Sequence, residues 1–432
     1  MAFSRQREIP IPYGTGTMPL HVEESRLRAV LEPAVPETSE EPAALVRRAL
    51  AAPIGSPPLH ELAVNRKRAL VITSDHTRPI PSAVTLPLLL EEIRKGSPEA
   101  DITILVASGL HRAMTEEEML KRFGYELLPR ERFVVHDAHD GAGMAYFGRL
   151  PSGGELYLNR LAAEADLVVS EGFIEPHFFA GYSGGRKSIL PGIASDATIR
   201  WNHNAGFIAD PRAWQGRLHD NPIHRDMAFA AEAARLAFIL NVLLDESKQI
   251  TAAFAGDPAA AHEAGCLRCG QLARVPAVQA DIVVTSNGGY PLDQNIYQCV
   301  KGMTAAEACV RPGGAVILCA ALGDGHGGEA FWRWFHDRPD AAAVAGAIEN
   351  IPKHRTLPDQ WQAQILARVM GRANCWLVTG ERDRELVEGM HLRWAKSADA
   401  ALEEATRLLG ERSDVTVIPN GVNVIVSSGG SD

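Results

Sequence analysis

Short apolar runs alternate with longer amphipathic stretches along the first half of the chain. Apolar, β-branched runs at residues 69–73, 102–107, 133–135, 167–170 and 237–244 predict buried strands. Residues 82–95 and 115–123 have helical spacing, and the second stretch opens on Thr-Glu-Glu-Glu, which is typical of a capping box. Strands that alternate with helices predict a largely parallel sheet covered by helices on both faces.

The same rhythm restarts after a Pro- and Ala-containing stretch at residues 270–280. We expect strands at residues 281–285, 315–319, 375–379 and 415–419, and helices at 295–310, 381–390 and 398–409. Ahead of the first strand, IPIPYG and MPLHV predict a small hairpin. The fold class is therefore α/β, with an N-terminal α/β domain over residues 1–274 and a C-terminal α/β domain over residues 275–432. We expect mainly parallel sheets flanked by helices and an active site in the interdomain cleft.

Composition excludes several classes of protein. The 432 residues have a formal charge of −10, so nonspecific nucleic-acid binding is not expected. The sequence contains no run of eighteen apolar residues, which argues against a membrane span. The first residues, MAFSRQREIPIPYGTG, lack the apolar core of a secretory signal. We therefore expect a cytoplasmic location.

The six cysteines do not form a disulfide framework in a chain of this length. Four of them stand among apolar residues and are interpreted as reduced core thiols: Cys299, Cys309, Cys319 and Cys375. Cys266 and Cys269 form a CLRC pair, half of a zinc or redox motif, but no second pair has matching spacing. We interpret this pair as a chance feature exposed to solvent.

The segment GFIEPHFFAGYSGGRKSILPG at residues 172–192 concentrates chemistry directly after a predicted strand. Glycines at 181, 184 and 185 allow a sharp turn whose N–H groups can approach an anion. Lys187 supplies a cation or, when neutral, a nucleophile, and His177 can exchange protons near neutral pH. Four aromatic residues are placed to exclude water: Phe173, Phe178, Phe179 and Tyr182.

A nucleoside-triphosphate loop does not explain this segment. The Walker A sequence needs glycine directly before its lysine and a helix after it. This chain has Arg186 before Lys187, and Pro191 would disrupt the helix. A tight turn with a solvated Arg-Lys pair is the simpler alternative.

Polar groups follow the predicted strands, at the edge where ligands bind in open α/β sheets. They are Asp75, Arg78, His111, His177, Tyr297, Gln298 and Lys301. Each has a structural alternative: Asp75 as a turn cap paired with Arg78, His111 as a solvated loop residue, and Tyr297 with Lys301 on an ordinary helix face. Likewise, His203 is open to interpretation as a satisfied buried histidine.

Four motifs together resemble one known family, the nickel-pincer-nucleotide lactate racemases and their homologues. They are SDHTRP (74–79), SGLHR (108–112), EPHFFAGYSGGRKSILPG (175–192) with WNHN after it, and GGYPLDQNIYQCVKGM (288–303). The motifs fall in both expected domains, so the resemblance covers most of the chain.

The resemblance implies a covalently tethered cofactor, pyridinium-3-thioamide-5-thiocarboxylic acid mononucleotide, in which nickel is held by a pyridinium carbon and two sulfurs. It implies that Lys187 carries the cofactor and that His203 is the protein ligand of nickel. His111 and His177 are then the paired acid/base residues. The remaining implied residues are the catalytic Arg78 and Lys301, the cofactor-binding Asp75, Ser183, Gly184, Gly185 and Arg186, and the substrate-side Tyr297, Gln298 and Trp361.

Inversion of C2 in a 2-hydroxy acid explains these residue types. A hydride acceptor avoids direct removal of a weakly acidic proton, while one histidine takes the hydroxyl proton and a second serves the other enantiomer. Arg78 suits a planar carboxylate, and Lys301 can polarise the developing oxygen. Expected partners are a small 2-hydroxy acid, lactate-like or larger, and the cofactor-biosynthesis enzymes. The alternatives are a cofactor-independent hydro-lyase, a proton-abstracting epimerase and a non-catalytic nickel-nucleotide binding protein.

Overall fold

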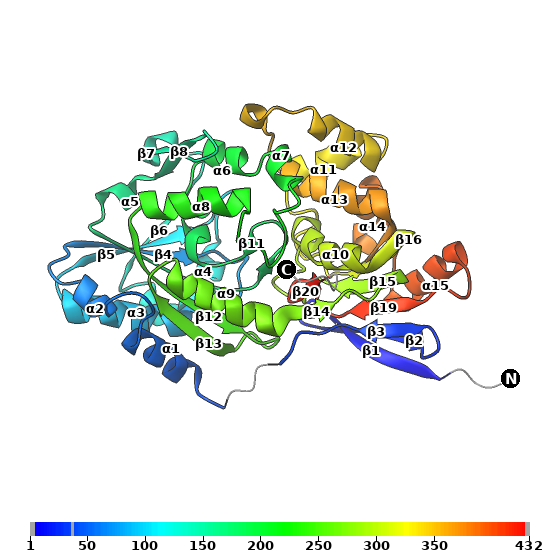
Figure 1. Ribbon diagram of the computed structural model, residues 1–432, viewed down its shortest axis with the longest axis horizontal. Helices are drawn as coiled ribbons and strands as arrows, with labels where there is room; N and C mark the ends of the chain where they lie inside the picture. Colours follow the sequence, from blue (N-terminus) through cyan, green and yellow to red (C-terminus); the bar gives the residue numbers. More distant parts are fainter. Residues whose placement is uncertain (1–4, 36–38, 428–432) are drawn as a thin grey trace. The chain divides into compact units, whose positions relative to one another are not determined.

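The computed structural model describes residues 5–35 and 39–427, which group into two compact units (Figure 1). Unit 1 comprises residues 1–34, 204–209 and 273–432, and unit 2 comprises residues 35–203 and 210–272. Each unit is built around a six-stranded sheet with helices on both faces, which confirms the predicted α/β class.

The sheet of unit 2 is parallel except at one edge. Its order is β13 (Ile250–Gly256), β12 (Leu236–Leu244), β9 (Leu167–Phe173), β4 (Arg68–Ser74), β5 (Asp101–Ala107) and β6 (Arg132–Val135). Only the pairing of β12 with β13 is antiparallel. Every strand expected in the first half of the sequence is present, within one to three residues of its expected ends.

Helices cover the unit 2 sheet because alternate strand residues point to opposite faces. Val71, Ile104 and Val169 point toward the core shared with α1 (Pro42–Ala51), α2 (Leu59–Leu62), α3 (Ser82–Gly96) and α4 (Glu116–Leu127). The predicted capping box is confirmed, since Thr115 and Glu118 cap the start of α4 reciprocally. The other helices of this unit are α5 (Arg160–Glu164), α6 (Asp196–Asn202), α8 (Pro222–Ala233) and α9 (Ala260–Ala273).

Shorter elements complete unit 2. They are the antiparallel pairs β7 (Met144–Arg149) with β8 (Glu155–Asn159) and β10 (Pro176–His177) with β11 (Gly181–Tyr182), and the 3-10 turns η1 (Gly141–Gly143) and η2 (Gly185–Ser188). The sequence pattern did not reveal β10, β11 and η2, because segments of two to four residues are too short to show a hydrophobic periodicity.

The sheet of unit 1 is parallel throughout. Its order is β18 (Arg393–Ala395), β17 (Asn374–Val378), β16 (Val310–Cys319), β15 (Ala280–Ser286), β19 (Val415–Ile418) and β3 (Leu27–Val30). A separate parallel pair joins β14 (Arg274–Pro276) to β20 (Ile425–Ser427). The expected strands at residues 281–285, 315–319, 375–379 and 415–419 are all confirmed.

The helices of unit 1 include two that the sequence predicted closely, α10 (Ile296–Cys309) and α15 (Ala398–Leu409). The helix expected at 381–390 is a 3-10 turn, η4 (Glu381–Asp383), followed by a short α14 (Arg384–Gly389). The others are α7 (Ala205–Ile208), α11 (Glu329–His336), α12 (Ala341–Glu349), the 3-10 turn η3 (Lys353–Arg355) and α13 (Gln360–Arg372).

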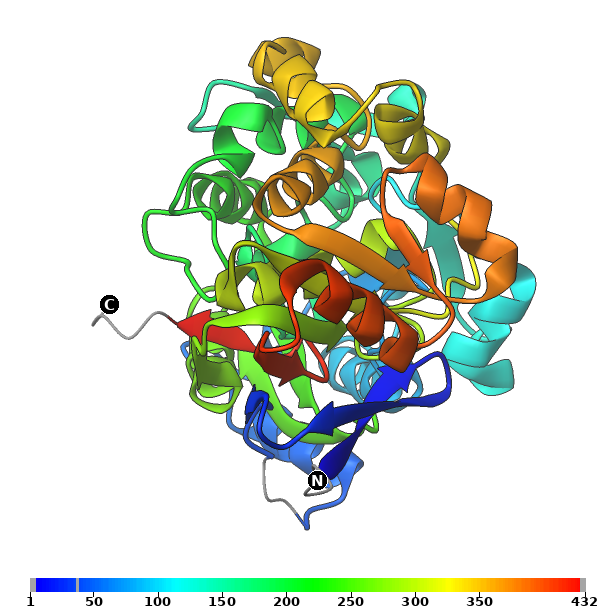
Figure 2. The ribbon, with the colours of Figure 1, turned by 90° about the vertical axis from the view of Figure 1, so that its right-hand side faces the viewer.

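The predicted N-terminal hairpin is present as β1 (Gln6–Tyr13) and β2 (Gly16–Glu23). Figure 2 shows this blue hairpin beside the red helix α15, although almost the whole chain separates them in sequence. His21 bonds to Asp399 at 2.8 Å, and Ile11 and Leu20 enter the core between the hairpin, α15 and the sheet. Apolar burial therefore places the hairpin in unit 1.

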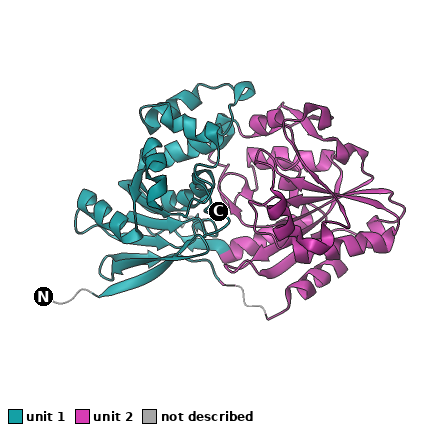
Figure 3. Ribbon diagram, turned by 180° about the vertical axis from the view of Figure 1, so that it is seen from behind, with its two compact units in different colours: residues 1–34, 204–209, 273–432 teal, residues 35–203, 210–272 magenta. Residues whose placement is uncertain are grey.

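The two units are not contiguous segments of the chain (Figure 3). We expected one domain over residues 1–274 and another over 275–432. The contact boundary falls at residues 272/273, and the described residues before 35 group with the C-terminal part because β3 joins its sheet. The interdomain cleft stays a prediction.

We predict that Phe238→Ala lowers the free energy of unfolding by about 3–5 kcal/mol, because Phe238 is fully buried in the unit 2 core. Urea unfolding followed by circular dichroism measures this change. Tyr125→Ala is the matched control: Tyr125 is 79% exposed, so its loss should shift the value by no more than about 0.5 kcal/mol. Equal losses in the two variants would contradict the assigned core.

Candidate active site

The strand order of unit 2 creates a switch point between β4 and β9. From β4 the chain proceeds to β5 and β6 on one side, whereas β9 is followed by β12 on the other. Ligands bind in open α/β sheets beyond the carboxyl ends of strands at such a point. Asp75 follows β4, His111 follows β5 and His177 follows β9, so the topology delivers three predicted site residues to one edge.

Asp75 and His111 form a direct pair, with Asp75 Oδ2 2.7 Å from His111 Nδ1. Asp75 Oδ1 also accepts hydrogen bonds from the Thr77 backbone N–H and hydroxyl, at 3.0 and 2.6 Å. One oxygen of Asp75 therefore caps the turn, as the structural alternative expected, while the other pairs with His111. The cofactor-binding role expected of Asp75 stays a prediction.

The electrostatics keep Asp75 ionised. Burial by itself would raise the pKa of this carboxyl, but the charge and hydrogen bond of His111, with help from Arg78 and Thr77, hold the pKa below its ordinary value. An ionised carboxylate can only accept, so the proton of the pair is on His111 Nδ1. When His111 is neutral, its Nε2 carries the lone pair that can accept a proton.

Arg78 lies on the same loop, partly exposed. Among the described residues, its Nη1 makes only long contacts with Thr77, 3.4 Å to the carbonyl and 3.3 Å to the hydroxyl. Its backbone carbonyl accepts from Arg122 Nη1 at 2.6 Å, which fixes the loop. The guanidinium can therefore turn toward a carboxylate without breaking a short hydrogen bond.

Phe179 lies at the centre of a second group. Its ring centroid is 4.6 Å from that of His177, 5.0 Å from that of His203 and 5.8 Å from Lys187 Nζ. The four aromatic residues expected to exclude water are buried, with 4–5% of each exposed. His177 Nδ1 accepts from the Ala180 N–H at 3.3 Å, so a neutral His177 has its proton on Nε2.

His203 is the C-cap residue of α6, and its backbone N–H donates to the Ile199 carbonyl at 2.9 Å. Burial, and then the nearby charge of Lys187, lower the pKa of His203 to about 3. The imidazole is therefore neutral at physiological pH, the form in which histidine binds metals.

The glycine turn that precedes Lys187 is held by the protein. Gly181, Gly184 and Gly185 have φ of 81°, 76° and 52°, where a side chain would be strained. The N–H of Ser183 bonds to Glu175 at 2.9 Å, and that of Gly185 bonds to Asn241 Oδ1 at 2.8 Å. The cofactor contacts expected of this turn stay a prediction, and in the structure these two donors have protein acceptors.

A third group of predicted residues lies in unit 1. Asn295 caps α10, which carries Tyr297, Gln298 and Lys301 after the carboxyl end of β15. Lys301 Nζ donates to Gln298 Oε1 at 2.6 Å, and both side chains are buried. Trp361 of α13 donates from its indole to the Tyr297 hydroxyl at 2.8 Å. The structure thus joins Trp361 to Tyr297, one of the residues expected on the substrate side.

Three residues near the glycine turn were not predicted from the sequence: His224, Asn241 and His262. They bond to Arg186, Gly185 and Ser183 respectively. Asn241 had a detectable signal, because it is a lone amide inside the apolar strand β12. His224 and His262 lie on the helices α8 and α9, and nothing in the sequence marked them as site residues.

The interpretation of Cys266 and Cys269 as exposed is wrong. They are 3% and 6% exposed, because residues three apart share one face of α9. Burial raises the pKa of the Cys266 thiol to about 12 and that of Cys269 further, so both are unreactive. The other four cysteines are buried and free, as expected.

Metal-binding clusters and membrane-spanning helices are both absent from the described part of the chain. No group of three or more His, Cys, Asp or Glu side chains there can hold a metal ion. None of the helices over residues 5–35 and 39–427 has the length and apolar character needed to span a bilayer.

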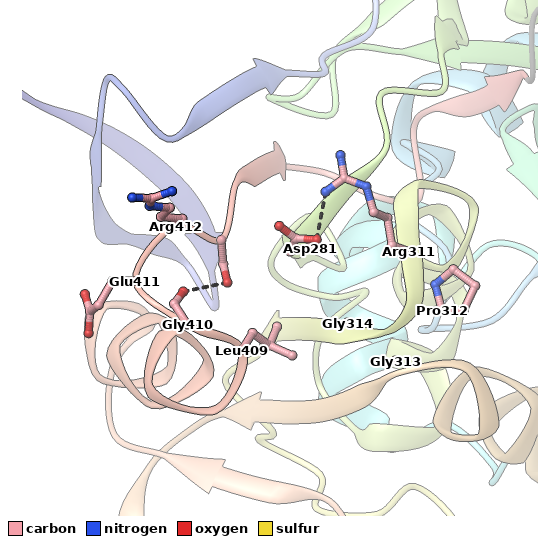
Figure 4. Close-up of a pocket in the computed structure, with 10 residues that line it drawn as sticks. Asp281, Arg311, Pro312, Gly313, Gly314, Leu409, Gly410, Glu411 and Arg412 are labelled. Carbon is pink, nitrogen blue, oxygen red and sulfur yellow. Dashed lines mark hydrogen bonds and ion pairs between the residues drawn. The ribbon is translucent and has the colours of Figure 1, made fainter.

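A cavity of about 470 Å³ opens at the amino ends of β15 and β16 (Figure 4). Arg311 in its wall is already paired, with Nη1 2.7 Å from carboxylate oxygens of both Asp281 and Asp414. Because ligands of open parallel sheets bind at the opposite, carboxyl ends, we do not assign this cavity to the site.

Comparison with protein-family models gives two matches. The lactate racemase N-terminal domain matches residues 13–216, and the lactate racemase C-terminal domain matches residues 275–426. The lactate racemase of Thermoanaerobacterium thermosaccharolyticum is 51% identical over 422 residues, covering 97% of this chain and 99% of the relative. That of Lactiplantibacillus plantarum is 50% identical over 381 residues, covering 88% of this chain and 90% of the relative.

Solved structures give the same result. The lactate racemase apoprotein from Thermoanaerobacterium thermosaccharolyticum superposes with a TM-score of 0.93 at 50% identity, covering 98% of this chain and all of the other. A protein from Thermotoga maritima has a TM-score of 0.66 at 19% identity, covering 92% of this chain and all of the other, which shows a shared fold only.

We predict that stability falls as pH falls below about 6.5, in part through His203. Its pKa is lowered in the folded state, so the unfolded chain binds a proton that the folded chain does not between about pH 6.5 and 3. The contribution is about 1.4 kcal/mol per pH unit. Urea unfolding at several pH values should show a slope that is smaller by this amount in His203→Asn. Exposed His139→Asn is the control, and an unchanged slope in His203→Asn would contradict the prediction.

Proposed function

The chain belongs to the lactate racemase family of isomerases, and from that premise we propose that it inverts C2 of a 2-hydroxy acid. The observation that carries the proposal is the pair of Asp75 and His111 beyond β4 and β5. An ionised carboxylate that fixes the tautomer of a histidine is a general-base arrangement. The substrate class includes lactate and larger 2-hydroxy acids.

The two histidines suit opposite proton transfers. His111 has its lone pair on Nε2 when neutral, because Nδ1 donates to Asp75. His177 has its proton on Nε2 when neutral, because Nδ1 accepts from Ala180. In the proposed scheme the neutral form of one histidine takes the hydroxyl proton of the substrate, and the doubly protonated form of the other returns a proton to the keto oxygen. The roles are reversed for the other enantiomer.

The described residues fit a tethered nickel-pincer nucleotide in the chemistry of their donors. His203 is a neutral buried imidazole, and Lys187 lies close enough for its charge to lower the pKa of His203. We propose that Lys187 carries the nucleotide through a thioamide and that His203 binds its nickel. When bound, the group supplies a reversible acceptor for the C2 hydride.

We propose that four side chains bind and orient the substrate: Arg78, Lys301, Tyr297 and Trp361. Arg78 binds the carboxylate, for which its planar fork is suited. Lys301, held by Gln298, stabilises charge that develops on the C2 oxygen. Tyr297 and Trp361, joined by their hydrogen bond, contact the rest of the substrate.

The proposal also covers the setting of the reaction. We propose that the chain acts in the cytoplasm and depends on the enzymes that build the nucleotide. A cofactor-independent hydro-lyase or epimerase would use the histidines without Lys187, and a nickel-nucleotide binding protein would need neither histidine.

We predict that Lys187→Ala abolishes covalent attachment and racemisation. Intact mass and nickel content, measured after co-expression with the cofactor-building enzymes, should show an adduct on the natural chain and none on the variant. Circular dichroism of lactate and larger 2-hydroxy acids follows inversion. A Lys187→Ala variant that inverts any of them at the natural rate would refute the tethered cofactor and favour the cofactor-independent alternatives.

We predict a separate effect for the acid/base residues. His111→Ala and His177→Ala should keep adduct and nickel but lower kcat by about 10²–10⁴, the usual contribution of proton transfer. Asp75→Asn should behave like His111→Ala, because an amide no longer fixes the tautomer. Full activity in either histidine variant would exclude the two-histidine scheme.

A further inference from the structure

Arg186 is a buried cation without a carboxylate among its hydrogen-bond partners in the described residues. It is 4% exposed, and burial lowers the pKa of its guanidinium only to about 10, so the charge remains at neutral pH. A buried charge needs compensation by hydrogen bonds when no ion pair is available. The partners of Arg186 therefore indicate what this residue does.

Three of its partners are carbonyls of one turn. Nη2 donates to Ala180 at 2.7 Å, and Nη1 donates to Tyr182 at 2.9 Å and to Gly184 at 3.3 Å. These carbonyls alternate along the segment that contains the positive-φ glycines. A rigid fork of donors that reaches all three fixes the conformation of the turn.

Two histidines from different helices complete the arrangement, which we call the Arg186 clamp: Arg186, His224 and His262. Arg186 Nε donates to His224 Nδ1 of α8 at 2.8 Å. His262 of α9 has Nε2 2.8 Å from the Ser183 carbonyl and 3.1 Å from Arg186 Nη1. This nitrogen donates to the carbonyl in one tautomer and accepts from the guanidinium in the other. Burial, and then the Arg186 charge, lower the pKa of both histidines, which are neutral and can surround a cation.

Arg186 of the clamp immediately precedes Lys187 in the chain. The Lys187 N–H bonds to the Gly184 carbonyl at 3.1 Å, the same carbonyl that Arg186 contacts. The conformation of the turn therefore fixes the backbone of Lys187. The Lys187 amine lies over the ring of Phe179. A change of about 1 Å in such a group can reduce turnover by about a hundredfold.

We propose that Arg186 is a positioning residue: anchored by His224, it fixes the turn of residues 180–185 and thereby the Lys187 amine, and it does not contact a ligand. The proposal rests on the proposed function in one respect, that the Lys187 amine is the group that must be placed. The placement itself can be tested without a cofactor.

The first test uses the full-length protein made without the cofactor-building enzymes. Acetylation of Lys187 by an N-hydroxysuccinimide ester is measured by peptide mass spectrometry, relative to the exposed Lys67. We predict that the ratio rises at least about fivefold in Arg186→Lys and His224→Leu, because the amine leaves its place over Phe179. His224→Asn restores an acceptor for Arg186 and should stay within about twofold of the natural chain.

Arg212→Lys is the matched control, because Arg212 is an exposed arginine of the same unit that is paired with Asp210. Circular dichroism verifies that each variant is folded. Should Arg186→Lys fail to fold, His224→Leu and its partner variant His224→Asn still decide the question. An unchanged ratio in folded Arg186→Lys, or in His224→Leu when Arg186→Lys does not fold, would overturn the proposal.

The second test uses protein matured with the cofactor. We predict that Arg186→Lys loses about ten- to hundredfold in kcat per loaded site, while KM changes by less than about threefold. A purely structural role would reduce yield or Tm and leave kcat per loaded site unchanged. A direct ligand contact would lower the loaded fraction without altering acetylation of the empty protein. Either result would overturn the proposal that Arg186 positions Lys187. If the natural chain carries no adduct but the variants still change the acetylation of Lys187, only the proposed function is contradicted.

Discussion

The site of unit 2 depends on one constraint, that parallel strands in a sheet end at the same edge. Because β4 lies between β5 and β9, the loops that follow these strands are neighbours. The Gly109 N–H bonds to the Gly192 carbonyl at 3.0 Å, which joins the loop of His111 to the end of the Lys187 segment. Residues from three distant parts of the sequence are brought to one edge by strand order.

Burial and the neighbouring side chains together shift the pKa values of the buried acids at this edge. Asp75 and Glu171 are carboxylic acids of neighbouring strands, and both are about 1% exposed. Asp75 faces His111 and Arg78, which hold its pKa low. Glu171 is bonded to the hydroxyls of Thr73 and Thr85, and burial raises its pKa. Neutral hydroxyl partners stabilise the ionised form less than a cation does, so the pKa values of these two buried acids shift in opposite directions.

The residues assigned to the substrate in unit 1 are also held before any ligand arrives. Lys301 is buried against Gln298, and the Tyr297 hydroxyl is fixed by Trp361. Fixed polar groups reduce the reorganisation that a reaction requires. In unit 2, Asp75 likewise holds His111 in place, and the Arg186 clamp holds the turn that carries Lys187.

The sequence by itself determined most strands, because a β-branched apolar run between turn residues is buried wherever it lies. Its motifs also made Lys187, His177 and His203 candidate site residues. Tertiary structure alone decided the pairing of Asp75 with His111, the inward direction of Arg186 and the burial of Cys266. It also decided that β1 and β2 pack against α15. The reason is physical: periodicity reports which face of an element is apolar, whereas contacts between distant residues depend on strand order and on what covers each face.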